Sequence, residues 1–239
     1  MEIMEGIEIV NFSLFIKKTK TLIISDLHIG LEAALNKEGV LIPRFQFDDL
    51  KEKTKQLLTE KKPERVILNG DIKHNFGKIS KQEWKNTFEY IDMLKENCEI
   101  VLIKGNHDKM LDPITDKRDL EIKTHHYEEG IYISHGDEIP ANIDFHKAKV
   151  LIVGHEHPSI TLRDGNRTET YKCFLKGNYK DKSLIVMPSA HTLSEGTDIT
   201  KEKLLSPFLN ENTTKNFEVY ITDEEIYYFG TVKEIIENF

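Results

Sequence analysis

The stretch Ile100-Val101-Leu102-Ile103-Lys104-Gly105-Asn106-His107-Asp108 joins an apolar run directly to a glycine, an amide, an imidazole and a carboxylate. The apolar run predicts a buried β-strand, and the Gly-Asn pair predicts the turn that ends it. Open α/β folds bind their ligands at the carboxyl ends of the strands. We therefore expect Asn106, His107 and Asp108 at the active-site edge of a sheet.

Four other short apolar runs also end in residue types that bind metal ions. The polar ends are Ser25-Asp26-Leu27-His28, Asn69-Gly70-Asp71, Ser134-His135-Gly136 and Gly154-His155-Glu156-His157. The same arrangement at five points of the chain predicts that five strands deliver polar side chains to one place.

The ordered motifs D-x-H, G-D, G-N-H-D, H-G and G-H-x-H are similar to those of the calcineurin-like binuclear metallophosphoesterases. One such motif is weak evidence, but all five stand in order between Asp26 and His157. The resemblance implies an α/β (α+β) fold, a four-layer αββα sandwich with two mixed β-sheets. The sequence pattern agrees, because strands first alternate with helices and then predominate.

The resemblance also implies seven ligands for two metal ions. Asp26, His28 and His157 would hold the first ion, Asn106, His135 and His155 the second, and Asp71 would bridge the two. Such a mixture of nitrogen and oxygen donors suits divalent transition metals better than calcium. We expect two such ions, with manganese favoured by the resemblance and iron, zinc, cobalt or nickel also suitable.

Four residues, Arg44, His74, Asn106 and His107, are expected to contact the substrate, and Asp108 is expected to act through His107. The resemblance implies that His107, beside Asn106, binds the phosphate and protonates the departing oxygen, and we expect Asp108 to orient the His107 ring. Arg44 lies in a loop that returns toward the first catalytic strand, and its guanidinium suits a phosphate; a surface arginine is the alternative. His74 closely follows the bridging ligand and would contact the phosphate or support a ligand; the alternative is a surface histidine.

Length and charge limit the class of protein. The 239 residues suffice for one large domain, so we expect a single metallophosphoesterase domain over residues 1–239, with its C-terminal hairpin and helix and no capping domain. The net charge of -8 predicts no general attraction to nucleic acid or membranes, so the metal ions must attract an anionic substrate locally. No apolar stretch reaches membrane-spanning length, and the two cysteines are far apart, which predicts a soluble cytoplasmic protein.

Within the family, the chain is most similar to the archaeal and bacterial SbcD-related phosphoesterases, including those encoded beside Lhr-type helicases. The likeness is carried by Ser25-Asp26-Leu27-His28-Ile29-Gly30, Ile42-Pro43-Arg44, Gly70-Asp71-Ile72-Lys73-His74 and Glu195-Gly196-Thr197-Asp198. It implies a role in DNA repair and a functional link to a helicase. We do not expect cleavage of long duplexes, because no capping domain that positions duplex ends is expected.

The resulting prediction is a metal-dependent phosphoesterase that hydrolyses phosphodiester bonds by a metal-bridging hydroxide, as a nuclease acting on single-stranded DNA or RNA. A phosphodiesterase or phosphatase for small nucleotides is one alternative. A non-catalytic scaffold with the same fold is another, although a scaffold has no need of His107 or the metal ligands. The lysines at 172, 176, 180 and 182 could follow a nucleic-acid backbone or could cover a solvated hairpin.

Overall fold

The computed structural model describes residues 1–42, 45–75, 80–109, 111–165, 167–194 and 196–238. Three candidates from the sequence, Pro43, Arg44 and Glu195, lie outside the described residues. The predicted contact of Arg44 with a phosphate therefore stays a prediction.

The first half of the chain forms a mixed β-sheet. Its strands lie side by side in chain order: β1 (Glu2–Met4), β2 (Ile7–Val10), β3 (Ser13–Ile16), β4 (Thr21–Ser25), β5 (Arg65–Asn69), β6 (Glu99–Ile103) and β7 (Ile122–Lys123). Neighbours are antiparallel from β1 to β4 and parallel from β4 to β7. Ser25, Asn69 and Ile103 are in register, so β4, β5 and β6 end side by side. The residues that follow these strands leave the sheet at one edge.

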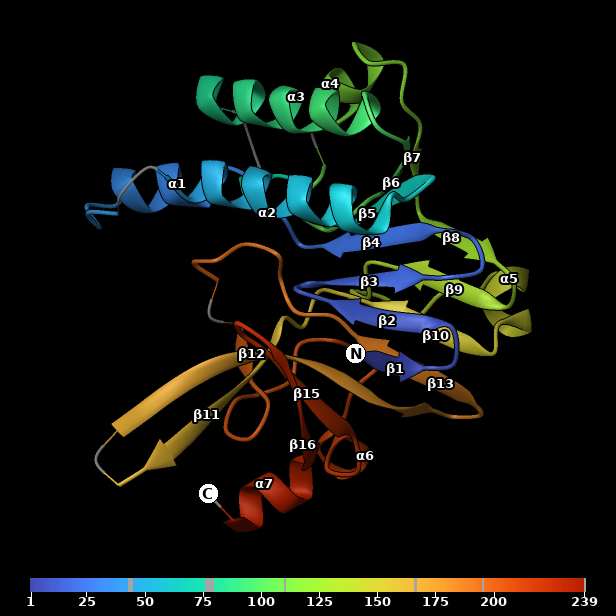
Figure 1. The fold of residues 1–239 in the computed structure, drawn as a ribbon, viewed down its shortest axis with the longest axis vertical. Helices are drawn as coiled ribbons and strands as arrows, with labels where there is room; N and C mark the ends of the chain where they lie inside the picture. The colour runs from blue at the N-terminus through green and yellow to red at the C-terminus, as the bar shows by residue number, and fades with distance from the viewer. Residues whose placement is uncertain (43–44, 76–79, 110, 166, 195, 239) are drawn as a thin grey trace.

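Helices cover the outer face of this sheet (Figure 1). They are α1 (Leu31–Lys37), α2 (Gln46–Lys61), α3 (Lys81–Lys95) and α4 (Asp112–Asp116). The sequence pattern Ser80-x-x-Glu83 predicts a capping box at the start of α3, and the structure contains it: Ser80 accepts from the Glu83 backbone N–H, and Glu83 accepts from the Ser80 N–H.

The second half of the chain forms another mixed sheet. Its strands follow the spatial order β14 (Thr197–Asp198), β11 (Pro158–Asp164), β12 (Arg167–Tyr179), β13 (Lys182–Val186), β10 (Val150–Val153), β9 (Ile131–Ser134) and β8 (His125–Glu128). The hairpin of β15 (Glu218–Thr222) and β16 (Ile226–Thr231) adds to β12 through β15. The helices α5 (Ile143–Lys147), α6 (Glu211–Thr214) and α7 (Val232–Asn238) belong to this half.

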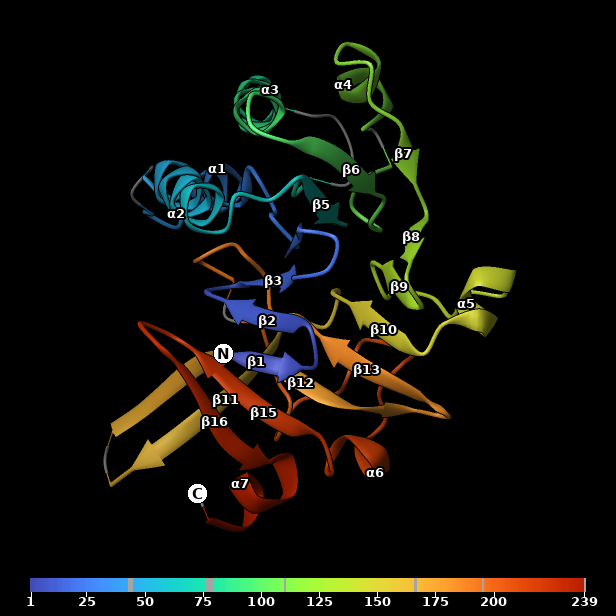
Figure 2. The same ribbon diagram turned by 45° about the vertical axis from the view of Figure 1, so that its right-hand side comes forward.

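Three buried clusters separate the layers. Alternate residues of a strand face opposite sides, so Leu22 and Ile24 of β4 join the cluster under α2 and α3, whereas Ile23 points the other way. Ile23 packs in a cluster shared with Ile152 of β10, which places that cluster between the two sheets (Figure 2). Leu151 belongs to the third cluster, with residues of α5 and α7. The predicted sandwich of two mixed sheets with helices is thereby confirmed. No helix among the described residues is long and apolar enough to cross a membrane.

Candidate metal centre

The candidate ligands leave the strands of both sheets at facing edges. Asp26 directly follows β4, Asp71 lies two residues after β5, and Asn106 lies three residues after β6. From the second sheet, His135 directly follows β9 and His155 lies two residues after β10. All seven candidate ligands lie close together in space. In the sequence they spread from Asp26 to His157, which are 131 positions apart.

Among the described residues three groups of side chains could hold a metal ion; His28, His74 and His107 form one, and the other two are those that the sequence predicts. The first predicted group is Asp26, His28 and His157, and the second is Asp71, His135 and His155; within each, the possible ligand atoms lie within 4.8 Å of one another. Asn106 joins the second group, because its Oδ1 lies 2.9 Å from His135 Nε2.

Each carboxylate is held by one oxygen and presents the other to the imidazoles. Asp26 Oδ2 accepts from Ser25 Oγ at 2.6 Å and from the His155 backbone N–H at 3.2 Å. Its Oδ1 lies 3.1 Å from His157 Nε2. Asp71 Oδ1 accepts from the His107 backbone N–H at 2.9 Å. These bonds fix the direction of the remaining oxygens.

Asp71 Oδ2 lies between the two groups. It is 3.8 Å from His28 Nε2, in the first group, and 3.5 Å from His135 Nε2, in the second. It is also 3.7 Å from His107 Nε2. One oxygen therefore faces both candidate ion positions and the candidate proton donor.

The backbone at five of the seven candidate ligands is left-handed. Their φ angles are 56° at Asp26, 42° at His28, 44° at Asp71, 65° at His155 and 48° at His157. Residues other than glycine adopt this conformation at a cost of about 1–3 kcal/mol each, and such strain gathers at functional sites. Directly after a strand, the sharp turns let D-x-H direct both of its side chains to the first group and let H-x-H direct one side chain to each group.

Glycines of the motifs make room for the ligands. A Cβ added to Gly105 would collide with the Asp71 carboxylate, and one added to Gly154 would collide with the Asp26 carboxylate. A Cβ on Gly70 would collide with the His135 ring. The glycines in G-D, G-N-H-D and G-H-x-H are thus required by the close packing of the ligands rather than by the turns alone.

The donor set fits divalent cations. Burial lowers the pKa of His28 to about 2 and that of His135 to about 4, which keeps these imidazoles in the neutral form that binds metal. Their Nδ1 atoms are buried without a hydrogen-bond partner among the described residues. Burial, followed by the charge of Asp26, raises the pKa of Asp71 to about 9, and a nearby cation would relieve this crowding of carboxylates.

Part of the chain matches a known protein family. Residues 19–123 match the family model described as calcineurin-like phosphoesterase. This part of the chain is similar to the calcineurin-like phosphoesterases. The matched residues include Asp26, His28, Asp71 and Asn106. The three remaining candidate ligands, His135, His155 and His157, follow the matched region in the sequence. A comparison with curated protein sequences found no match.

Solved structures share the fold of this chain. The crystal structure of Pseudomonas putida nuclease MPE is similar over 91% of this chain and 92% of that one, with a TM-score of 0.66 and 18% identity. The phosphoesterase YfcE from E. coli is similar over 90% of this chain and 94% of that one, with a TM-score of 0.41 and 13% identity. The first likeness is one of fold, and the second is too distant to support an inference.

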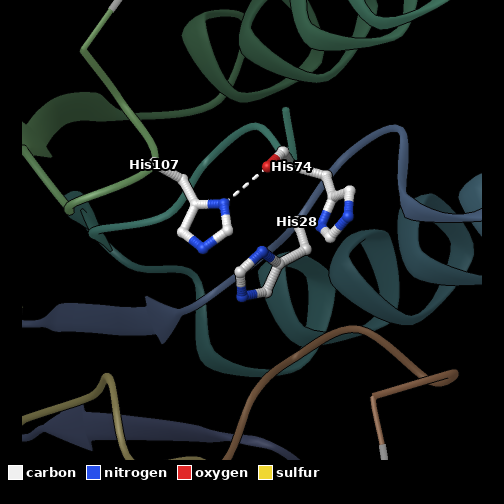
Figure 3. Close-up of side chains that lie close together, drawn as sticks. All are labelled: His28, His74 and His107. Atoms are coloured by element: carbon white, nitrogen blue, oxygen red, sulfur yellow. Dashed lines mark hydrogen bonds between the residues drawn. The ribbon is translucent and has the colours of Figure 1, made fainter. Parts of the chain in front are cut away.

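Three imidazoles, those of His28, His74 and His107, lie close together (Figure 3). The ring of His28 lies 5.0 Å from that of His107 and 5.6 Å from that of His74. The His107 Nδ1 atom is 2.5 Å from the backbone oxygen of His74. A carbonyl oxygen only accepts, so Nδ1 carries a proton and Nε2 faces Asp71. The half-buried His74 ring is part of this group and not a surface loop histidine.

Asp108 does not contact the His107 ring, contrary to our expectation. Its carboxylate accepts from the backbone N–H groups of Gly105 at 3.0 Å, Ile72 at 3.1 Å and Lys73 at 3.3 Å. Asp108 thus joins the loop after β5 to the loop after β6, and the His74 carbonyl orients the ring. The side chain is buried at the base of both loops, where no substrate reaches it.

The four lysines of β12, β13 and the turn between them make contacts within the protein. Lys172 donates to the carbonyl oxygens of Ser189 and His191, and Lys182 donates to two further carbonyls. Lys176 pairs with Glu218, and Lys180 lies over the ring of Tyr179. These contacts within the protein could not be predicted from the spacing of the lysines in the sequence.

A cavity of about 490 Å³ adjoins the centre. Asn106 and His135 form part of its wall, and Lys104, Lys109, Thr124 and Tyr132 line it further out. This cavity could not be predicted from the sequence, because the residues that line it come from segments far apart in the chain.

Proposed function

We propose that this protein is a binuclear metal-dependent phosphodiesterase that acts as a nuclease on single-stranded DNA or RNA. The observation that carries the proposal is the position of Asp71 Oδ2, within 3.8 Å of ring nitrogens of both ligand groups and of His107. A single oxygen shared in this way suits a bridging ligand between two cations with a proton donor beside them.

The residues assigned to the ions are those of the two groups. Asp26, His28 and His157 would hold one ion, Asn106, His135 and His155 the other, and Asp71 both. When bound, the two ions would polarise the phosphoryl oxygens and lower the pKa of a water molecule. Manganese is the ion we favour, and iron, zinc, cobalt or nickel suit the same donors.

His107 would supply the proton for the leaving group. Its Nδ1–H donates to the His74 carbonyl, which fixes the tautomer and stabilises the imidazolium form. The second proton would then sit on Nε2, which faces Asp71 and the candidate ion positions. Proton donation of this kind contributes about 10² to 10⁴-fold to rate. His74 acts here through its carbonyl, and its ring would add a contact to the phosphate.

Two observations support a nucleic-acid substrate. The fold is similar to that of a nuclease over nearly the whole chain. The adjoining cavity of about 490 Å³ has room for a nucleoside beside the phosphate; Lys104 and Lys109 on its wall suit a neighbouring phosphate, while Asp137 and Glu138 also line it.

One observation favours the alternative of a small-nucleotide phosphodiesterase or phosphatase. The lysines of β12 and β13 contact carbonyls, a carboxylate or an aromatic ring of the protein itself, so they do not offer a path for a longer strand. Five further expectations from the sequence stay predictions. They are membership of the SbcD-related subgroup, the link to a helicase, a role in DNA repair, a cytoplasmic location and a single domain over residues 1–239.

A substrate panel with manganese tests the proposal. It contains single-stranded DNA, duplex DNA, RNA, cyclic nucleotides, dinucleotides and p-nitrophenyl esters. We expect cleavage of single-stranded DNA or RNA as well as of bis-p-nitrophenyl phosphate. Turnover of small nucleotides and nitrophenyl esters alone would reject the nuclease and leave the small-nucleotide enzyme. No turnover of any ester with either manganese or another suitable ion would favour the scaffold.

A further inference from the structure

Lys73 is fully buried, with 0% of its surface exposed, although it carries an ammonium group. Its Nζ donates to the backbone oxygen of His107 at 2.6 Å and to that of Asn75. The carboxylates of Asp108 and Glu83 act on the ammonium with favourable charge. Burying a charge is costly, and burial lowers the pKa of Lys73; the two hydrogen bonds and the nearby carboxylates offset part of that cost.

The loop that carries Lys73 is also held by backbone contacts to Ile29 and Glu83. Lys73 pairs with Ile29 in an isolated β-bridge, and the His74 backbone N–H donates to Ile29 O at 3.0 Å. The Asn75 backbone N–H donates to Glu83 Oε1 at 3.1 Å. With these contacts, residues 73–75 are anchored to the D-x-H loop and to the start of α3.

The ammonium of Lys73 connects this anchored loop to His107. The backbone oxygen of His107 accepts from Lys73 Nζ, and the ring of His107 donates from Nδ1 to the backbone oxygen of His74. His107 is therefore held at its main chain and at its ring by two consecutive residues. If the first contact were lost, His107 would keep the ring bond to His74 and the bond from its backbone N–H to Asp71 Oδ1, but its backbone carbonyl would lose its tie to the loop of residues 73–75.

We propose that Lys73 is a positioning residue for His107, setting the imidazole that donates the proton to the leaving oxygen. The inference rests on the proposed role of His107 in the phosphodiesterase. Lys73 would then serve the reaction without binding a metal ion or contacting the substrate.

Lys182 provides a matched control. It is also buried, with 8% of its surface exposed, and its Nζ donates to the backbone oxygens of His146 at 3.0 Å and Ala148 at 2.7 Å. Replacing either lysine by methionine leaves two carbonyls without their donor. Lys182 touches none of the candidate ligands, so Lys182→Met reports the structural cost alone.

The first test compares Lys73→Met with Lys182→Met on two substrates. We expect both variants to lose thermal stability, while only Lys73→Met loses kcat on single-stranded DNA, by about 10²-fold, the effect of a displacement near 1 Å at a reacting group. KM should change little. On bis-p-nitrophenyl phosphate, whose leaving group needs no proton, Lys73→Met should lose far less. Equal losses on the two substrates, or equal behaviour of the two variants, would overturn the proposal.

The second test does not depend on activity. In zinc-loaded protein with nitrogen-15 histidine, the Nδ1–H resonance of His107 is identified by its absence in His107→Gln. We expect it to shift or broaden in Lys73→Met and to be unchanged in Lys182→Met; an unchanged resonance in both overturns the proposal. This result stands even if wild type fails to cleave DNA, an outcome that would reject the nuclease instead.

A second variant covers the case in which Lys73→Met does not fold. Lys73→Gln keeps two N–H donors without the charge, and we expect a smaller loss than in Lys73→Met, again concentrated on the DNA substrate. Equal losses of Lys73→Gln on DNA and on the nitrophenyl ester would count against a positioning role.

Discussion

His107→Ala should separate proton donation from metal binding. His107 Nε2 lies 3.7 Å from Asp71 Oδ2, and the ring belongs to neither of the two groups assigned to the ions, although it forms a third group with His28 and His74. The variant should therefore keep both ions. On single-stranded DNA it loses the proton donor, about 10² to 10⁴-fold in rate, or about 3–5 kcal/mol of barrier. On bis-p-nitrophenyl phosphate it loses only a contact with the phosphate.

The assay is the ratio of the two losses, measured as kcat/KM on both substrates with manganese, alongside the metal content. His107→Gln is the matched variant, because its amide keeps an N–H donor near the position of Nε2 but cannot transfer a proton. It should recover activity on the nitrophenyl ester and not on DNA. His146→Ala, which removes an exposed histidine of α5, should behave as wild type. Equal losses of His107→Ala on the two substrates would refute the reasoning and leave His107 as a binding residue.

Three further predictions follow from contacts around the centre. Gly154→Ala places a Cβ against the Asp26 carboxylate, so metal analysis should find less than the wild-type content and the activity should fall on every substrate; full content would contradict the packing argument. Asp108→Asn leaves one oxygen for three backbone N–H groups, and urea unfolding should show a loss of about 1.5–3 kcal/mol, whereas a stability equal to wild type would argue against these bonds. Treatment with a chelator should abolish activity, and manganese should restore it far better than magnesium, which keeps water in preference to imidazole; equal rates with magnesium would count against the histidine ligands.

The two sheets and the convergence of the motifs could be predicted because both depend on local patterns. Apolar runs such as residues 100–103 read as buried strands, and a glycine or asparagine directly afterwards marks the end of each. Parallel strands that end in register then bring Asp26, Asp71 and Asn106 to one edge. These inferences need no knowledge of the contacts between distant side chains.

The errors and omissions concern contacts between loops. Asp108 stands beside His107 in the sequence, but its oxygens face the N–H groups of the loop after β5. Lys73 and Lys182 look like surface lysines until the carbonyls that they reach are placed. The left-handed backbone at Asp26 and His155 is likewise imposed by the packing around the centre, since neither residue type requires it.

The central claim is that Asp71 joins two metal ions into one catalytic centre. Its most direct test is the metal content of wild type and Asp71→Ala after loading with manganese and removal of free ions, with phosphodiesterase activity measured on the same samples. We predict two ions per chain in wild type, and in Asp71→Ala a reduced content and no activity. Wild-type turnover by an Asp71→Ala protein that still carries two ions would contradict the account.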